Sequence, residues 1–350
     1  MQIGIIGFKF TGKTTLFNVI TGAGQPTGVG GVEPHLAVGR VPDPRLDRLT
    51  AMFKPKRQVN ASVEWVDIPG FAGGDGGGQR ESTKFLEHGR KVDALAQVVR
   101  CFGGGYGAPD PVGELESMAL ELGLADLQIV ENRLEKLAKE KARMGKVANP
   151  LEPPMMERFR AQLENDRPLR DLELNPDEAK ISSGYAFLTL KPMIVVLNHA
   201  EGEDAPDDAV AAARAMGAEV VALCASVEEE LAELEAGEAA EFLADLGIAE
   251  PALNRMIRAS YGALQLQSFF TVGPDECRAW AVRRGATAPE AAGAIHSDLQ
   301  RGFIRAEVTA YDDLIGAGDM AKAKAANLVR LEGKQYVVRD GDILEIRFSV

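Results

Sequence analysis

Gly7-Phe8-Lys9-Phe10-Thr11-Gly12-Lys13-Thr14 matches the pattern G-x-x-x-x-G-K-[ST] in full. An apolar run at residues 2–6 precedes it, and residues 14–20 take up helical spacing after it. A glycine-rich loop between a strand and a helix offers backbone N–H groups and a helix N-terminus to phosphate. A chance match is the alternative in a chain with 37 Gly, but the strand and the helix argue against it. The stretch therefore predicts a phosphate-binding loop in an α/β nucleotide-binding domain.

The residue types in this loop predict its contacts. Lys13 would reach the β- and γ-phosphates, and the Thr14 hydroxyl would ligate Mg²⁺. Lys9 would place a fixed cation near the phosphates, with a solvated lysine as the alternative. The expected nucleotide contacts within the loop are Gly7, Lys9, Phe10, Thr11, Gly12, Lys13, Thr14 and Thr15.

A second motif, Asp67-Ile68-Pro69-Gly70, ends a predicted strand at residues 61–68. Nucleotide hydrolases place a carboxylate near the metal at this point, followed by a glycine whose N–H meets the γ-phosphate. Asp-x-x-Gly also occurs in ordinary turns, so its meaning depends on the phosphate loop before it. We expect Thr14 and Asp67 to hold the metal, and Lys13 and Gly70 to be catalytic.

A third motif, Asn198-His199-Ala200-Glu201, follows an apolar run at residues 193–197. GTPases carry Asn-Lys-x-Asp here, and the Asp carboxylate accepts hydrogen bonds from guanine. The longer Glu201 displaces that carboxylate, so guanine selectivity should weaken and adenine can enter the pocket instead. Asn198, His199 and Glu201 are the expected base contacts, and helix capping by Asn198 is the alternative.

The remaining apolar runs indicate how these motifs are arranged. Further strands are predicted at residues 94–102 and 220–224 with helices between most strands, which is typical of a parallel, doubly wound sheet. The second and third motifs are separated by about 70 residues more than two strand and helix units need. The excess fits an inserted helical hairpin, because the positions Val130, Leu134, Leu137, Met156, Phe159 and Leu163 follow heptad-like spacing around Pro and Asn breakers.

The first arm of this hairpin is basic. The segment from Arg133 to Lys146 holds six Lys and Arg residues against Glu135 and Glu140. It is a candidate RNA contact, and a solvated helix face is the alternative.

The chain changes character after residue 267. Short strands are predicted at 269–272, 278–282, 303–308, 336–338 and 343–348, with a helix at 289–297. A small mixed sheet that holds a helix is expected. The predicted domains are a nucleotide-binding domain at 1–112 and 186–266, the inserted hairpin at 113–185, and a C-terminal domain at 267–350.

The composition excludes several classes of protein. The 350 residues are 45% hydrophobic and 26% charged, which argues against disorder and disulfide scaffolds. Lys plus Arg number 39 and Asp plus Glu 52, a net charge of −13, so no uniformly basic surface coats the protein. The three cysteines lack zinc-ligand or redox-pair spacing, and no apolar run has the length of a membrane span. We expect a cytoplasmic protein with no membrane partner.

Several stretches resemble the YchF family of Obg-like ATPases. They are Gly-Lys-Thr-Thr-Leu-Phe-Asn (12–18), Val-Pro-Asp-Pro-Arg-Leu-Asp (41–47), Val-Val-Arg-Cys-Phe (98–102), Asn-x-x-Glu (198–201), Phe-Leu-Thr-Leu-Lys-Pro (187–192), Gly-Ala-Thr-Ala-Pro (285–289), Gly-Phe-Ile-Arg-Ala (302–306) and Arg-Asp-Gly-Asp (339–342). The resemblance spans essentially the whole chain. It implies a Ras-like P-loop domain, an inserted coiled-coil hairpin and a C-terminal TGS domain of β-grasp type.

The same resemblance implies an activity. It implies ATP binding in preference to GTP, slow hydrolysis to ADP, and association with the ribosome through the hairpin or the TGS-like domain. Cys224-Ala225-Ser226 resembles the loop whose backbone completes the base pocket. Phe71 stands where related GTPases carry a water-orienting Gln, as hydrophobic residues do in this family, so intrinsic turnover should be slow. The alternatives are a GTPase of the Obg type and a nucleotide-gated interaction module with little turnover.

The chain also departs from the family pattern. Phe10 replaces an Asn that can help bind a monovalent cation, which leaves potassium dependence open. Gly31 stands where the family has a Thr that senses Mg²⁺ and γ-phosphate. The glycine-rich loop 73–78 is expected to need a ligand for order, and the loop 103–111 lacks the family's histidine. The expectation is intact nucleotide binding with altered switching.

Overall fold

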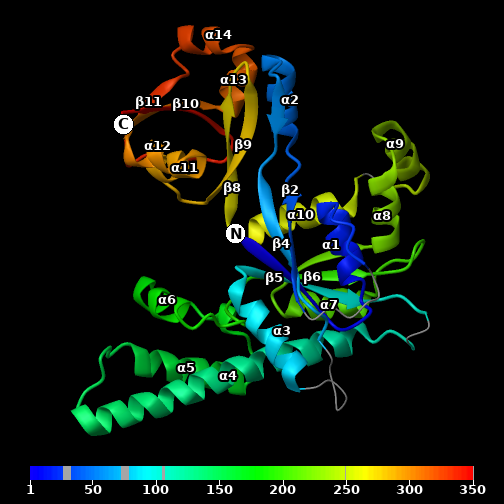
Figure 1. Ribbon diagram of the computed structural model, residues 1–350, viewed down its shortest axis with the longest axis vertical. Coiled ribbons are helices and arrows are strands. Elements are labelled where there is room, and N and C mark those ends of the chain that lie inside the picture. Colours follow the sequence, from blue (N-terminus) through cyan, green and yellow to red (C-terminus); the bar gives the residue numbers. More distant parts are fainter. Residues whose placement is uncertain (27–32, 72–78, 105–106, 249, 350) are drawn as a thin grey trace. The chain divides into compact units, whose positions relative to one another are not determined.

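The computed structural model describes residues 1–26, 33–71, 79–104, 107–248 and 250–349. The chain divides into two compact units (Figure 1). The first consists of Met1–Ala37 and Glu64–Met256, and the second of Val38–Val63 and Ile257–Val350.

A six-stranded sheet forms the centre of the first unit, in the order β2-β4-β1-β5-β6-β7. The five strands from β4 to β7 are parallel. Their ranges are β1 (Gln2–Ile6), β4 (Ser62–Asp67), β5 (Ala94–Arg100), β6 (Met193–Asn198) and β7 (Glu219–Leu223), with β2 (His35–Arg40) at the edge. Strands β5 and β6 are buried at every position, as expected where helices cover both faces of a sheet. The predicted parallel sheet is confirmed.

Helices cover this sheet with their apolar sides. Helices α3 (Gln79–Lys91), α4 (Pro111–Met144) and α7 (Asp207–Ala215) share one core cluster with β5 and β6, which includes Phe85, Leu115 and Leu197. Helix α1 (Lys13–Thr21) packs on β1 and against α8 (Ala225–Glu233). The unit also contains α9 (Ala236–Asp245), and α10 (Ala252–Ala263) leads from it into the second unit.

The predicted helical hairpin is formed by α4 and α5 (Glu152–Glu164), which lie side by side in Figure 1. The first turns of α4 belong to the sheet core, and only its later turns face α5. There Val130 and Leu137 join Met156 and Phe159 in a separate cluster, which extends to η1 (Leu169–Asp171) and Phe187, with α6 (Pro176–Ser183) beside α5. One continuous helix thus runs from the sheet to the tip of the hairpin.

A buried carboxylate fixes the middle of α4. Asp126 accepts hydrogen bonds from the Arg90 guanidinium at the end of α3 (2.9 Å), from the Leu188 and Thr189 backbone N–H groups (3.0 and 2.7 Å), and from the Thr189 hydroxyl (2.8 Å). A buried charge with this many partners is well compensated. Asp126 therefore joins α3, α4 and the chain that enters β6.

The second unit holds a mixed sheet in the order β11-β10-β12-β8-β9-β3. Strands β8 (Leu266–Val272) and β9 (Glu276–Arg283) form an antiparallel hairpin, and β12 (Asp342–Phe348) pairs parallel with β8 and antiparallel with β10 (Phe303–Ala310). Helix α11 (Ala288–Ile295) packs on it. This is the β-grasp arrangement expected from the resemblance. The remaining elements are α12 (Ser297–Arg301), α13 (Tyr311–Ala317), α14 (Met320–Ala325) and β11 (Arg330–Glu332).

Two local predictions in this unit were wrong. Residues 336–338 form no strand, because Val337 makes one isolated bridge to Thr287 and the segment pairs with the turn before α11 rather than with a strand. The helix predicted at 289–297 divides, because His296 is extended and its ring accepts a hydrogen bond from the Asp298 N–H, which starts α12.

The segment Val38–Val63 lies in the second unit, although we expected residues 1–112 in the nucleotide-binding domain. Its strand β3 (Arg57–Val59) pairs parallel with β9, and its helix α2 (Pro44–Phe53) packs on β9 and β8. Arg45 of α2 makes an ion pair with Asp340 at 2.8 Å. The pairing joins segments more than 200 positions apart, which local sequence patterns do not reveal. The other expected domain boundaries stay predictions.

Candidate nucleotide site

The phosphate loop lies between the end of β1 and the start of α1, as predicted. Gly7 and Gly12 have φ angles of 146° and 92°. A Cβ atom on Gly7 would lie 2.4 Å from the Val98 carbonyl oxygen, and one on Gly12 would lie 2.4 Å from Asn198 Nδ2. Only glycine fits at either position, so neighbouring strands fix the path of the loop.

Lys13 lies buried at the start of α1, with 7% of its surface exposed. Its ammonium donates a hydrogen bond to the Phe8 carbonyl within the loop. Burial lowers the pKa of Lys13 to about 8, although the charges of Asp67 and Glu114 oppose this shift. The described ion pairs do not include Lys13, so its charge is available to a phosphate.

Thr14 and Asp67 lie together, 53 positions apart in the sequence. The Thr14 hydroxyl donates a hydrogen bond of 2.8 Å to Asp67 Oδ2. Asp67 is only 8% exposed, and burial raises its pKa even though Thr14 and Lys13 act in the opposite direction. A hydroxyl and a carboxylate are oxygen ligands of the kind that Mg²⁺ prefers, so both residues fit a magnesium ion. The described residues contain no group of three or more His, Cys, Asp or Glu side chains that could hold a metal ion.

Gly70 lies against the phosphate loop. A Cβ atom at Gly70 would lie 3.0 Å from Lys13 Nζ and 3.2 Å from Lys9 Cγ. The backbone N–H of the next residue, Phe71, donates a hydrogen bond of 3.0 Å to the Gly7 carbonyl. The second motif is therefore in contact with the first.

The Phe71 side chain belongs to the core of the unit. Its ring lies 5.7 Å from that of Phe8 and 5.2 Å from that of Phe85, measured between centroids, and it is buried. The position holds no group that could orient water by a hydrogen bond.

Asn198 connects the third motif to the other parts of the site. Its Nδ2 donates a hydrogen bond of 3.0 Å to the Thr11 carbonyl, and its Oδ1 accepts one of 3.0 Å from the Ala225 N–H. Ala225 is the first residue of α8, so Asn198 caps a distant helix rather than one of its own. Cys224-Ala225-Ser226, expected to be a loop, is the N-cap and first residues of α8, and Asn198 holds it beside the phosphate loop.

The other predicted base contacts lie near these two loops. The His199 backbone N–H donates to the Leu223 carbonyl at 2.9 Å, and its ring Nδ1 lies 2.9 Å from the Ala200 carbonyl. The Cys224 sulfur lies 3.2 Å from the Ser226 hydroxyl. Glu201 is exposed after β6. The structure brings Asn198 and 224–226 together and leaves the Glu201 carboxylate on the surface.

Two predicted switch features, Gly31 and the loop 73–78, lie outside the described residues. In the loop 103–111, the Arg100 guanidinium donates to the carbonyls of Gly107 (3.1 Å) and Ala108 (3.3 Å). Sequence reasoning missed Glu114, which accepts a hydrogen bond of 3.1 Å from the Arg100 N–H and acts on the charge of Lys13. Burial raises the pKa of Glu114. The Asp110-Pro111 helix start could have indicated that a carboxylate at 114 lies in the first turn.

A phosphate loop, a hydrogen-bonded Thr and Asp pair and an Asn that holds the start of α8, all at the carboxyl edge of a parallel sheet, define a Ras-like P-loop nucleotide-binding protein. No described helix has both the length and the apolar character required to cross a membrane. Residues 266–349 match the YchF-GTPase_C family, described as a protein of unknown function (DUF933), and residues 2–142 match the MMR_HSR1 family, described as 50S ribosome-binding GTPase. The chain belongs to the YchF family.

Individual relatives match over their whole length. The chain is 44% identical to the ribosome-binding ATPase YchF of Pasteurella multocida, covering 100% of this chain and 99% of the relative, and 41% identical to that of Bacillus subtilis, covering 100% of both. It superposes on the structure of the Schizosaccharomyces pombe YchF GTPase with a TM-score of 0.86 at 30% identity, covering 99% of this chain and 97% of the other.

Proposed function

We propose that this protein binds ATP with Mg²⁺, hydrolyses it slowly to ADP, and associates with the ribosome in a manner that depends on the bound nucleotide. The main support for the proposal is that Asn198 hydrogen-bonds both to the phosphate loop and to the start of α8. It thereby holds the proposed phosphate and base contacts next to each other. The names of the relatives, ribosome-binding ATPase YchF, support the same activity.

Different residues of the site would contact the phosphates and the magnesium ion. Lys13 exchanges its hydrogen bond to the Phe8 carbonyl for contacts with the β- and γ-phosphates, and the phosphate charge then raises the lowered pKa of its ammonium. Thr14 and Asp67 would hold the magnesium ion, which neutralises phosphate charge when bound. The Gly70 N–H would contact the γ-phosphate, because Gly70 lies close to Lys13 Nζ at the phosphate loop. Gly7 to Thr15 supply the remaining contacts.

Slow turnover follows from Phe71. Its ring is buried between Phe8 and Phe85, so the attacking water lacks the side chain that would orient it. Preference for ATP follows from Glu201, whose longer side chain replaces the Asp that recognises guanine. We also place the protein in the cytoplasm and the RNA contact on α4 and the β-grasp unit.

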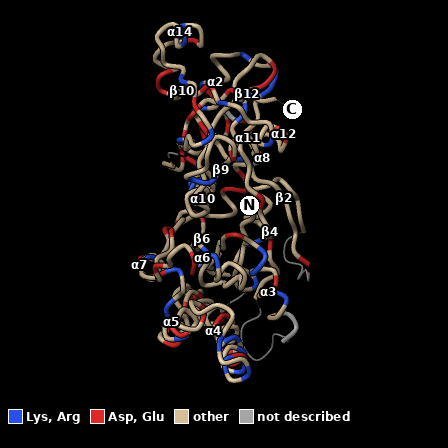
Figure 2. Tube along the Cα trace, turned by 90° about the vertical axis from the view of Figure 1, so that its left-hand side faces the viewer, with Lys and Arg blue, Asp and Glu red and all other residues tan. Residues whose placement is uncertain are grey.

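The basic face of α4 supports the ribosome contact. Arg133 forms ion pairs with Glu152 of α5 at 2.7 Å and with Glu140 of α4 at 3.3 Å. The first of these joins α4 to α5. The other five cations are exposed, namely Lys136, Lys139, Lys141, Arg143 and Lys146. Figure 2 shows Lys and Arg gathered at the end of α4. Exposed cations on a projecting helix suit the phosphates of RNA.

Calorimetric titration of nucleotide-free protein with ATP and with GTP, each with Mg²⁺, tests the proposal, and Lys13→Ala is the control. Tighter binding of ATP than of GTP, together with slow formation of ADP at saturating ATP, supports it. Preference for GTP would favour the GTPase of the Obg type, and binding without any turnover would favour the nucleotide-gated interaction module.

A further inference from the structure

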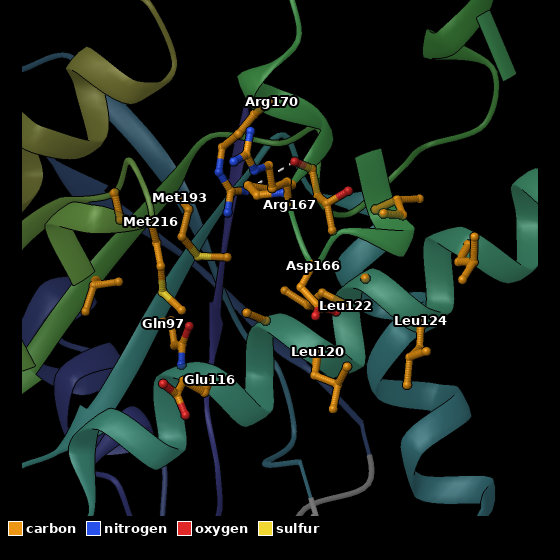
Figure 3. A pocket seen from close by; sticks show the side chains of 18 residues that line it. Gln97, Glu116, Leu120, Leu122, Leu124, Asp166, Arg167, Arg170, Met193 and Met216 are labelled. Atoms are coloured by element: carbon orange, nitrogen blue, oxygen red, sulfur yellow. Dashed lines mark hydrogen bonds between the residues drawn. The ribbon is translucent and has the colours of Figure 1, made fainter. Parts of the chain in front are cut away.

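A cavity of about 430 Å³ lies where α4 leaves the sheet, away from the nucleotide site. Its walls come from α4, from Gln97 of β5, from Met193 of β6 and from the segment that follows α5 (Figure 3). None of the phosphate-loop residues, Asp67 or Asn198 lines it. The volume is in the range of small-molecule sites.

One wall of this cavity is an apolar face of α4. Leu120, Gly123, Leu124 and Leu127 follow the spacing of one helix face and line the cavity. Leu120 and Leu124 are 51% and 52% exposed, so about half of each side chain is open to solvent. A Cβ atom on Gly123 would meet no atom within 4 Å, so the space in front of this helix is open. The wall offers apolar surface that the chain itself does not cover.

The segment that follows α5 contributes two arginines and one carboxylate, Asp166, to the lining, so its net charge there is positive. Arg170 and Arg167 lie together there in Figure 3, and Gln97 and Glu116 lie at the other end. Arg170 Nη1 donates to the carbonyls of Thr189 (3.3 Å) and Lys191 (3.1 Å), whereas its Nε is buried without a hydrogen-bond partner. No ion pair among the described residues involves Arg170. Burial lowers its pKa, against the charges of Asp171 and Asp126. The guanidinium is thus a partly desolvated cation without a contacting counter-ion.

We propose that this cavity binds an organic monoanion, with its apolar body on the leucine face of α4 and on Met193, and its anionic group at Arg170 and Arg167. The anion supplies the direct ion-pair contact that is not found for Arg170 among the described residues, and the apolar body covers the exposed leucines. Such a ligand touches the sheet and α4 at once. It would therefore stiffen the joint between the hairpin and the nucleotide-binding sheet.

Fluorescence titration with 1-anilinonaphthalene-8-sulfonate tests this on the full chain, and the uncharged N-phenyl-1-naphthylamine is the matched probe. We expect one saturable site for the sulfonate. Arg170→Gln should weaken the sulfonate about tenfold, because a charge-assisted contact is lost, and leave the uncharged probe unchanged. Gly123→Leu should weaken both probes, because its side chain fills the cavity while leucine favours the helix.

Calorimetric ATP affinity of each variant checks that the fold is intact. If Arg170→Gln also loses ATP binding, the test rests on Arg167→Gln and Gly123→Leu. Both residues line the cavity, and neither makes the carbonyl contacts that Arg170 makes. Equal sulfonate binding in the parent protein and Gly123→Leu would overturn the proposal, as would the absence of a saturable site. Equal weakening of both probes by the arginine variants would overturn the assignment of an anion.

Discussion

The Asn198 side chain donates a hydrogen bond of 3.0 Å to the Thr11 carbonyl, across 187 positions of sequence. The same amide accepts from the Ala225 N–H, so one buried residue holds the phosphate loop and the start of α8 together. Asn198, the residue predicted to contact the base, therefore also supports the phosphate loop from the end of β6.

Asn198→Ala should therefore weaken both stability and binding. It leaves the Thr11 carbonyl and the Ala225 N–H without their partner, at a cost of about 1–3 kcal/mol in the free energy of unfolding. Urea denaturation measures this loss, and calorimetry should show weaker ATP binding. Glu203→Ala, at an exposed position after β6, is the neighbouring control. A variant with unchanged ATP affinity would show that Asn198 does not organise the site.

ATP affinity should fall as pH rises through about 8, the lowered pKa of Lys13. Below this pH the ammonium is already charged, whereas above it the free protein must take up a proton to bind phosphate. Calorimetry at pH 8 in two buffers of different ionisation enthalpy measures this uptake. Lys13→Ala should show none of it. Proton release at this pH would contradict the assignment.

Phe71→Gln should not accelerate hydrolysis. The new amide would lie in the apolar space between Phe8 and Phe85, which should destabilise the unit by about 3 kcal/mol. Phe71→Leu, which keeps the site apolar, is the control. Turnover of ATP and thermal unfolding are measured together. A faster enzyme with unchanged stability would show that residue 71 can reach the attacking water.

Removal of the Arg45 and Asp340 pair should destabilise the second unit in a coupled way. Burial raises the pKa of Asp340, but its hydrogen bonds with Arg45 and the Ser268 N–H outweigh this and leave the pKa below its usual value. The stabilisation should be present at neutral pH and be lost as pH falls through that lowered pKa. A double-mutant cycle with Arg45→Gln and Asp340→Asn should give a coupling of about 1 kcal/mol, since both side chains are partly exposed. Additive effects would mean that the pair contributes nothing.

Binding to ribosomes should weaken steeply with salt. Replacement of Lys136, Lys139, Lys141 and Arg143 by Gln should lower the slope of log affinity against log salt by up to about 3. Cosedimentation at several salt concentrations measures the slope. Replacement of two exposed cations of the first unit outside the hairpin, Lys91 of α3 and Arg214 of α7, is the matched control. A salt-independent complex would exclude α4 as the electrostatic contact.

The sequence predicted the elements whose signals are local. The phosphate loop, the parallel strands and the hairpin follow from a complete motif and from periodic apolar positions, and the structure contains them. The place of α2 and β3 was missed, because it depends on pairing of Arg57 with Glu276 and on the Arg45 contact with Asp340. The role of Glu114 was missed for the same reason, since it acts through the fold. Residues 336–338 were predicted as a strand from their residue types alone. A β-prone triplet forms a strand only where another strand can pair with it, and here Val337 makes only an isolated bridge to Thr287.

The second unit is built from two separate segments of the chain, Val38–Val63 and Ile257–Val350, so it cannot be removed by a truncation at one end. A gene shortened after residue 266 would still encode Val38–Val63, and the product would carry β3 without β9 and α2 without β8 and β9, the strands on which it packs. Such a fragment would expose a bare strand edge and an apolar helix, and it should aggregate. The β-grasp unit therefore cannot be gained or lost by adding or deleting a C-terminal segment alone. Recombination must keep both segments of the unit together.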